Sequence, residues 1–217
     1  MDKFDGDLMK LYKDKIIPEN VSYDIFKQIV NSVTCLFNCD HLYMDLKLEN
    51  ILYRCEEEDK FIVILGDLGG VIGSRKKSVP DGMSHTFEYP KLKEVVLTDI
   101  PLHRLNENKI DFEAKISERD VVWLLGYLYL HILSFNDNDL IETNSNIKNL
   151  NTKILSLVKK KTQYIKEISE ISEIYEEYNK LIKHISSDNK YMNFIHKCLT
   201  DEKYTLEKLK NDLSDSI

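Results

Sequence analysis

Four polar side chains lie close together in the first third of the chain, at spacings that suit phosphoryl transfer. Asp45, Lys47 and Asn50 belong to the stretch YMDLKLENIL, and Asp67 belongs to GDLGG. Phosphoryl transfer needs hard oxygen ligands for Mg²⁺, a group that accepts the proton of the attacking hydroxyl, and a cation beside the phosphate. We therefore expect Asp45 to accept the proton, Lys47 to neutralise the phosphate, and Asn50 with Asp67 to hold the metal.

The order of these residues resembles a known family. D-L-x-x-x-N, followed across two short apolar runs by D-x-G, is similar to the catalytic loop and metal loop of protein kinases. Lys47, two positions after the candidate base, matches the serine/threonine pattern of that family. The resemblance implies ATP and Mg²⁺ as cofactors, with Asp7 near the ribose, Leu52 under the adenine, and Lys47 and Asp67 at the phosphates.

The resemblance extends along the chain as a single C-terminal lobe, residues 1–217. Residues 1–8 look like a hinge, 43–70 like the catalytic and metal loops, 71–111 like an activation segment and 120–217 like the helical subdomain. SHTFEYP, residues 84–90, resembles a peptide-binding loop around Thr86 to Pro90. No G-x-G-x-x-G loop and no V-A-I-K strand occur in the sequence. We therefore expect activity to need an N-terminal lobe, which a separate chain could supply.

Two further positions bear on regulation and on packing. Tyr43-Met44 stands where the family has His-Arg before the catalytic aspartate, so phosphorylation of the activation segment has no arginine to bind beside Asp45. Asp120, at the start of an apolar run, is the candidate for the central-helix carboxylate that accepts N–H groups from the catalytic loop.

The elements that position these residues follow from hydrophobic periodicity. Apolar residues at helical spacing predict a helix over 23–37, and runs at 51–53 and 61–65 predict a β-hairpin. The prolines in 73–111 predict a long irregular surface segment. The remaining expected elements are helices: a buried one over 121–133, one or two amphipathic ones over 146–186, and a final pair over 191–198 and 206–213. The fold class is therefore mainly α with a small β-hairpin, as in a protein-kinase-like C-lobe.

Composition limits the kinds of partner. The 217 residues carry a formal net charge of −7, and the lysines are interspersed with acids, which argues against nucleic acid. The N-terminus does not look like a signal peptide, and no apolar run is long enough to cross a membrane. Four cysteines do not form a disulfide framework, so we expect an intracellular, cytoplasmic protein that does not bind membranes.

Three hypotheses remain open. The first is a serine/threonine kinase lobe that acts on a protein substrate once an N-terminal lobe is supplied. The second is a noncatalytic, pseudokinase-like module that binds a regulatory protein through the surface around Thr86 to Pro90 and the helices beyond it. The third is an unrelated helical protein that carries the motif by chance, because D-x-G is a common turn. The retained Asp45, Lys47, Asn50 and Asp67 favour the first, and the missing lobe favours the second.

Overall fold

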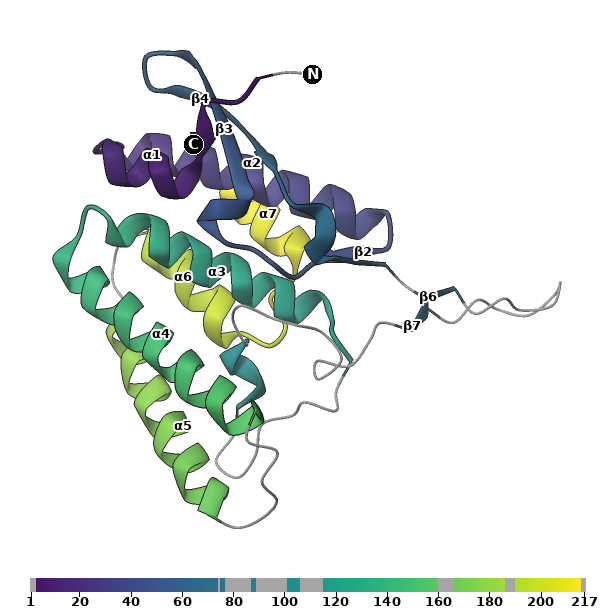
Figure 1. Cartoon of the computed structure of the whole chain (residues 1–217), viewed down its shortest axis with the longest axis vertical. Coiled ribbons are helices and arrows are strands. Elements are labelled where there is room, and N and C mark those ends of the chain that lie inside the picture. The colour runs from purple at the N-terminus through teal and green to yellow at the C-terminus, as the bar shows by residue number, and fades with distance from the viewer. Residues whose placement is uncertain are drawn as a thin grey trace, which may run out of the picture.

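The computed structural model describes residues 3–73, 75–76, 87–88, 101–105, 115–159, 166–185 and 190–215. These residues form a mainly helical fold with small antiparallel sheets (Figure 1). The helices are α1 (Leu8–Asp14), α2 (Glu19–Asn38), α3 (Glu118–Ser134), α4 (Asn138–Lys159), α5 (Lys166–Ile185), α6 (Lys190–Thr200) and α7 (Leu206–Ser214). The strands are β1 (Gly6–Asp7), β2 (His41–Tyr43), β3 (Ile51–Glu57), β4 (Lys60–Leu65), β5 (Val71–Gly73), β6 (Arg75–Lys76) and β7 (Phe87–Glu88). Three short 3-10 helices are η1 (Leu48–Asn50), η2 (Leu68–Gly70) and η4 (Leu102–Arg104).

The predicted fold class is confirmed at this level of description. The hairpin lies where the two apolar runs predicted it, as β3 and β4, and the helix predicted over 23–37 is α2, which begins at Glu19. The region 146–186 holds parts of two helices, α4 and α5, which pack on each other. Among the described helices, none combines the length and the apolar character that crossing a membrane requires.

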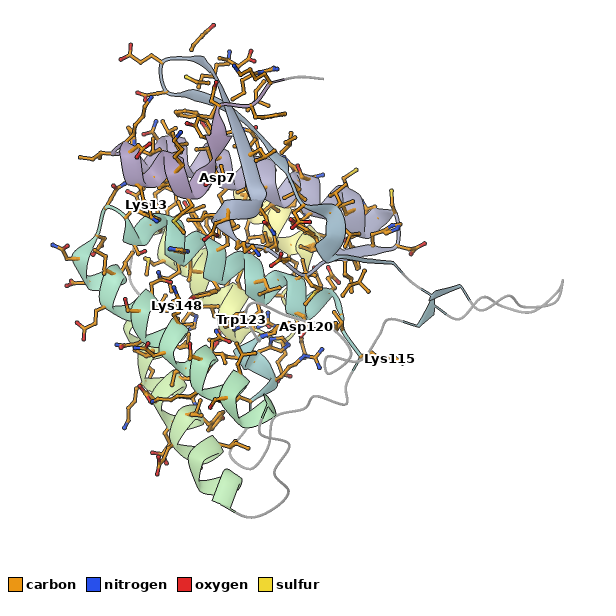
Figure 2. All side chains as sticks on the ribbon, viewed as in Figure 1. Asp7, Lys13, Lys115, Asp120, Trp123 and Lys148 are labelled. Carbon is orange, nitrogen blue, oxygen red and sulfur yellow. The ribbon has the colours of Figure 1, made fainter. Side chains whose placement is uncertain are left out.

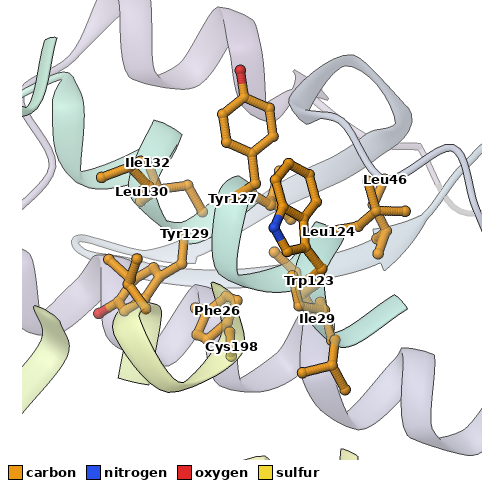
Figure 3. Packing of buried hydrophobic residues seen from close by; sticks show 14 of the residues in the cluster. Phe26, Ile29, Leu46, Trp123, Leu124, Tyr127, Tyr129, Leu130, Ile132 and Cys198 are labelled. Carbon is orange, nitrogen blue, oxygen red and sulfur yellow. The ribbon is translucent and has the colours of Figure 1, made fainter. Parts of the chain in front are cut away.

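Helix α3 is the centre of the core. Nearly every residue from Asp120 to Ser134 is buried, as the absence of a polar face predicts. The helix packs against α6, α4 and α2 (Figures 1 and 3). A Cβ added to Gly126 would lie 2.4 Å from the Cβ of Cys198 on α6, so only glycine permits this separation of the two helices. Phe26 of α2 stacks on Tyr129 of α3, with ring centroids 4.1 Å apart.

The hairpin lies against α2, which closes its outer edge. β3 pairs on one side with β1 and on the other with β4, giving a three-stranded sheet in the order β1-β3-β4. The side-chain amide of Gln28 on α2 donates to the Phe61 carbonyl at 2.9 Å and accepts from the Val63 N–H at 3.1 Å. One side chain thus takes the place that a neighbouring strand would occupy beside β4.

The prediction of a surface segment over 73–111 is wrong for the described residues near its end. Leu102, Arg104 and Leu105 are buried, and Leu102 and Leu105 belong to the hydrophobic core. The physical reason lies at α3: Arg104 donates to both carboxylate oxygens of Asp120, which is fully buried. The peptide-binding loop expected at 84–90 lies outside the described residues, apart from the backbone of Phe87–Glu88.

The role expected for Asp120 is also wrong. Its carboxylate accepts from the Ser117 N–H at 2.7 Å within a capping box, from Arg104, and lies 3.3 Å from Nε2 of His103. These partners come from the ends of η4 and α3, and the residues of the candidate catalytic loop are not among them. Asp120 caps its own helix and binds the segment that precedes it. Figure 2 shows it at the start of α3, close to Lys115.

Candidate active site

The stretch between β2 and η1 alternates between the core and the open side. Met44, Leu46 and Leu48 are buried, whereas Asp45 and Lys47 between them are partly exposed. In an extended segment successive side chains point to opposite faces, so three apolar anchors fix the backbone and hold two polar side chains outward. The odd composition of YMDLKLENIL therefore has a structural cause. The apolar residues secure a loop whose polar residues are presented together.

Asp45 is the centre of a polar cluster. Nζ of Lys47 lies 2.9 Å from Oδ2 of Asp45, and Nδ2 of Asn50 donates to the same oxygen at 2.7 Å. Nδ2 of Asn50 also donates to the Asp45 carbonyl at 3.0 Å. Asn50 is buried at the end of η1, so its amide is held in place by burial as well as by these bonds. Of the three residues predicted to be catalytic, Lys47 and Asn50 thus both contact Asp45.

The turn that carries Asp67 is brought beside this cluster by the pairing of β2 with β5. Met44 N–H donates to the Gly70 carbonyl at 3.0 Å, and a Cβ on Gly70 would lie 2.5 Å from the Cβ of Asp45. Gly66 N–H donates to the Asn50 carbonyl at 2.6 Å, which ties the end of β4 to η1. Glycine at position 70 is therefore a condition for the two loops to approach this closely.

Asp67 has a left-handed backbone, with φ 40° and ψ 70°. This conformation is uncommon outside glycine, although aspartate tolerates it better than most residues. Its Oδ1 accepts from the Gly69 N–H at 3.3 Å, and the side chain is exposed. Backbone strain of this kind costs of order 1–3 kcal/mol and is concentrated at functional sites.

Tyr43 connects the catalytic-loop segment to the turn at Asp67, a role that its sequence context does not indicate. Its hydroxyl donates to the Gly66 carbonyl at 2.6 Å and lies 3.4 Å from the Asp67 carbonyl. Burial, followed by the charge of Asp45, raises the pKa of Tyr43 to about 12, although a hydrogen bond with Asn50 lowers it and Asp67 raises it further. The phenol therefore stays protonated and remains a donor at neutral pH.

Asp7 and Leu52, the two residues expected at the nucleoside, are directly opposite each other in the pairing of β1 with β3. The side chain of Asp7 also caps α1, accepting from the Lys10 N–H at 2.9 Å. Leu52 is the register partner of Ile64, so both lie on one face of the hairpin. The structure thus groups the candidate nucleoside residues on the sheet and the candidate phosphate residues on the adjacent loops.

The donor set suits Mg²⁺. Asp67 supplies a carboxylate and Asn50 an amide oxygen, and both are hard ligands of the kind that magnesium accepts alongside several waters. Nδ2 of Asn50 points at Asp45, which leaves its Oδ1 as the atom for a metal. Within the part of the chain that the structure describes, no group of three or more histidine, cysteine or acidic side chains is placed to bind a metal. A site made of one carboxylate and one amide differs from such a group.

Comparison with known proteins does not assign a family. No protein-family model matches the chain, and a search of curated proteins found no relative.

Proposed function

We propose that this chain is the catalytic lobe of a serine/threonine protein kinase, which transfers a phosphoryl group from ATP to a protein hydroxyl. The observation that carries the proposal is the Asp45 cluster. A carboxylate bound by both a lysine and a buried asparagine lies beside a strained aspartate turn. The same four residues have the order and spacing of kinase catalytic and metal loops.

Each side chain has a distinct task in this proposal. Asp45 accepts the proton of the attacking hydroxyl, and Lys47, which already contacts the carboxylate, provides the positive charge where the phosphate is transferred. Asn50 orients Asp45 through two hydrogen bonds and offers its remaining oxygen to the metal. Mg²⁺, when bound to Asn50 and Asp67, would neutralise charge on the phosphates. Leu52 and Asp7 would contact the adenine and the ribose.

A partner lobe is part of the proposal. Ile62, Ile64 and Leu68 are among the most exposed large hydrophobic side chains of the described chain, with exposed fractions of 36%, 39% and 61%. They lie on β4 and η2, beside Leu52 and Asp67, where a second lobe would cover the nucleotide. Excluding water from the phosphates strengthens every electrostatic interaction there. Full activity would therefore need a lobe that covers this face.

The same apolar face favours a second candidate, a noncatalytic kinase-like module that binds a regulatory protein. Both candidates place a protein on Ile62, Ile64 and Leu68, but only the first needs Asp45 and Asp67 as chemical groups. Binding of nucleotide separates the two.

The test is a thermal shift with Mg-ATP on the wild-type chain and on two matched variants. A ligand at 100 times its Kd stabilises the native state by about 2.7 kcal/mol. We expect a shift for wild type, none for Asp67→Asn, and a wild-type shift for Asp59→Asn. Asp59 is the right control because it also has a positive φ, of 60°, but lies in the hairpin turn. No shift for wild type at millimolar Mg-ATP would sink the kinase proposal and leave the binding module.

A further inference from the structure

His103 is a largely buried imidazole at the point where η4 packs against α3. Its side chain is 13% exposed, and its Nε2 lies 3.3 Å from Oδ1 of Asp120. We therefore place the proton of the neutral imidazole on Nε2, where it donates to the carboxylate. The other nitrogen, Nδ1, is buried and has no hydrogen-bond partner among the described residues. A second proton has to bind at Nδ1, so protonation would create a buried N–H group that lacks an acceptor.

The charges that face His103 also oppose a second proton. Arg104, the next residue of η4, donates to both carboxylate oxygens of Asp120 and so balances its charge. Arg119 of α3 adds another cation, and its Nη1 donates to a neutral group, the Cys198 carbonyl of α6, at 2.6 Å. Burial lowers the pKa of His103 most; the contact with Asp120 raises it, and the charges of Arg119 and Arg104 lower it, with a net decrease. A charged imidazole would thus be the third cation beside this carboxylate.

Other charged side chains near these helix ends have partners elsewhere or face solvent. Glu118 of α3 accepts from a backbone N–H at the start of α7 at 2.7 Å, and Lys197 of α6 is paired with an aspartate of α7 at 2.8 Å. Lys115 and Asp201 are exposed. The pKa of Asp120 is about 2, and arginine does not lose its proton, so the groups that face His103 keep their charges near neutral pH. A pH change in this range therefore acts on the imidazole.

The segment that carries His103 depends on its attachment to the core. Leu102 and Leu105 are buried, and η4 packs on both α3 and α6. Within η4, the Arg104 N–H donates to the Pro101 carbonyl at 3.1 Å and the Leu105 N–H to the Leu102 carbonyl at 3.0 Å. A single helical turn is not stable by itself in water. Release from α3 would therefore expose these two amide protons to exchange.

We propose that His103 is a pH-sensitive contact, which holds η4 against α3 while its imidazole is neutral and releases η4 when the imidazole is protonated. The solvated imidazole of the open segment binds a proton more readily than the buried one of the closed segment. The ordinary pKa of histidine is about 6.5, so the contact is fully stable above that pH and weakens as pH falls below it. The opening constant rises by up to about tenfold per pH unit, until the buried imidazole is protonated as well. This inference does not depend on the proposed kinase function, and its test needs no nucleotide.

The experiment is amide hydrogen exchange followed by NMR at pH 7.5, 6.5 and 5.5, corrected for the pH dependence of exchange in an unstructured chain. We expect the protection of the Leu105 N–H to fall about fivefold or more between pH 7.5 and pH 5.5. The Val63 N–H, which donates to the side chain of Gln28, should keep its protection. An equal fall at Val63 would mean that acid destabilises the whole fold, and constant protection at Leu105 would mean that η4 does not respond. Either result would overturn the proposal.

Two histidine replacements supply the controls. His103→Gln retains an amide that can donate to Asp120 and is not protonated in this pH range, so Leu105 should stay protected at pH 5.5. His131→Gln is the matched change on α3, because His131 is also partly buried and burial lowers its pKa. This variant should show the same fall at Leu105 as wild type. A wild-type fall in His103→Gln, or its absence in His131→Gln, would contradict the role of His103.

The titration of His103 in the unmodified chain gives a test that no folding defect of a variant can obscure. The NMR signal of its Cε1–H, followed from pH 8 to pH 4.5, should have a midpoint below the ordinary value of about 6.5. A midpoint at or above that value would show that the folded chain accepts the proton without cost, and would overturn the proposal.

Discussion

Asp45 and Asp120 are both carboxylates held by a basic side chain and by hydrogen bonds, but their surroundings differ. The Asp45 side chain is 22% exposed and that of Lys47 is 31% exposed, whereas Asp120 is fully buried and Arg104 is 6% exposed. The partly exposed pair of Asp45 and Lys47, called the open pair below, adds little to stability because water screens its charges. The buried pair of Asp120 and Arg104, called the sealed pair, is costly to break. A carboxylate bound to a basic side chain can therefore serve as an accessible chemical group, as at Asp45, or as a buried structural contact, as at Asp120.

Removing one partner of the sealed pair should give the largest effect on stability. We expect Asp120→Ala to lower the free energy of unfolding by about 3–5 kcal/mol, because Arg104 would lose the buried carboxylate that binds two of its nitrogens. Urea unfolding monitored by circular dichroism measures the loss. The double variant Arg104→Met with Asp120→Leu should lose much less than Asp120→Ala, since no lone charge remains. A double variant that is as unstable as the single one would contradict this account of the pair.

The two close glycine contacts extend the comparison from charges to packing. Gly126→Ala places a Cβ against Cys198 in the core, and Gly70→Ala places one against Asp45 at the site. Overpacking costs about 1–3 kcal/mol, so both variants should be less stable by urea unfolding. Only Gly70→Ala should also reduce the thermal shift with Mg-ATP beyond what its stability explains. Equal nucleotide binding in the two variants would remove Gly70 from the site.

Acid should remove the stability that the buried Asp120 carboxylate contributes. Burial alone would raise the pKa of Asp120, but hydrogen bonds and charge from His103 and Arg104 outweigh it and lower the pKa to about 2. A depressed pKa in the folded state stabilises the protein above the unfolded value near 3.9, and this stability is lost as pH falls toward 2. We expect urea unfolding between pH 5 and pH 2.5 to show a loss of stability in wild type that is smaller in Asp120→Asn. Parallel curves would show that Asp120 does not contribute to it.

Neutralising the open carboxylate should have the smallest effect on stability. Asp45→Asn keeps the size of the side chain and removes a partly exposed ion pair, so the free energy of unfolding should change by about 1 kcal/mol or less. In a phosphorylation assay with labelled ATP, a partner lobe and a protein substrate, the same variant should lose activity. A stable, active Asp45→Asn would remove the proposed proton acceptor.

The features that the sequence could predict are those that depend on local spacing. The helices α2, α3, α6 and α7 and the β-hairpin follow from apolar periodicity, a local property, and they lie where it predicted them. The grouping of Asp45, Lys47 and Asn50 was also local, since they lie within six residues. Local spacing was sufficient because η1 turns the chain back at Asn50.

Contacts between distant segments could not be predicted from the sequence. Arg104 follows Pro101 in an irregular segment, and nothing in its own neighbourhood indicates that it binds Asp120, 16 positions later. The position of Tyr43 marks it only as a replacement for the histidine of the kinase pattern, and does not indicate that its hydroxyl contacts the carbonyl of Gly66.

The amide of Gln28 has a consequence for how this protein behaves in a crowded solution. A bare edge strand is a template on which another chain can add a strand, and this is a common route to aggregation. Because Gln28 already pairs with the Phe61 carbonyl and the Val63 N–H, β4 cannot offer these groups to a second molecule. Ile62 and Ile64 can therefore stay exposed on the hairpin while these two backbone groups of β4 are closed to a strand of another molecule.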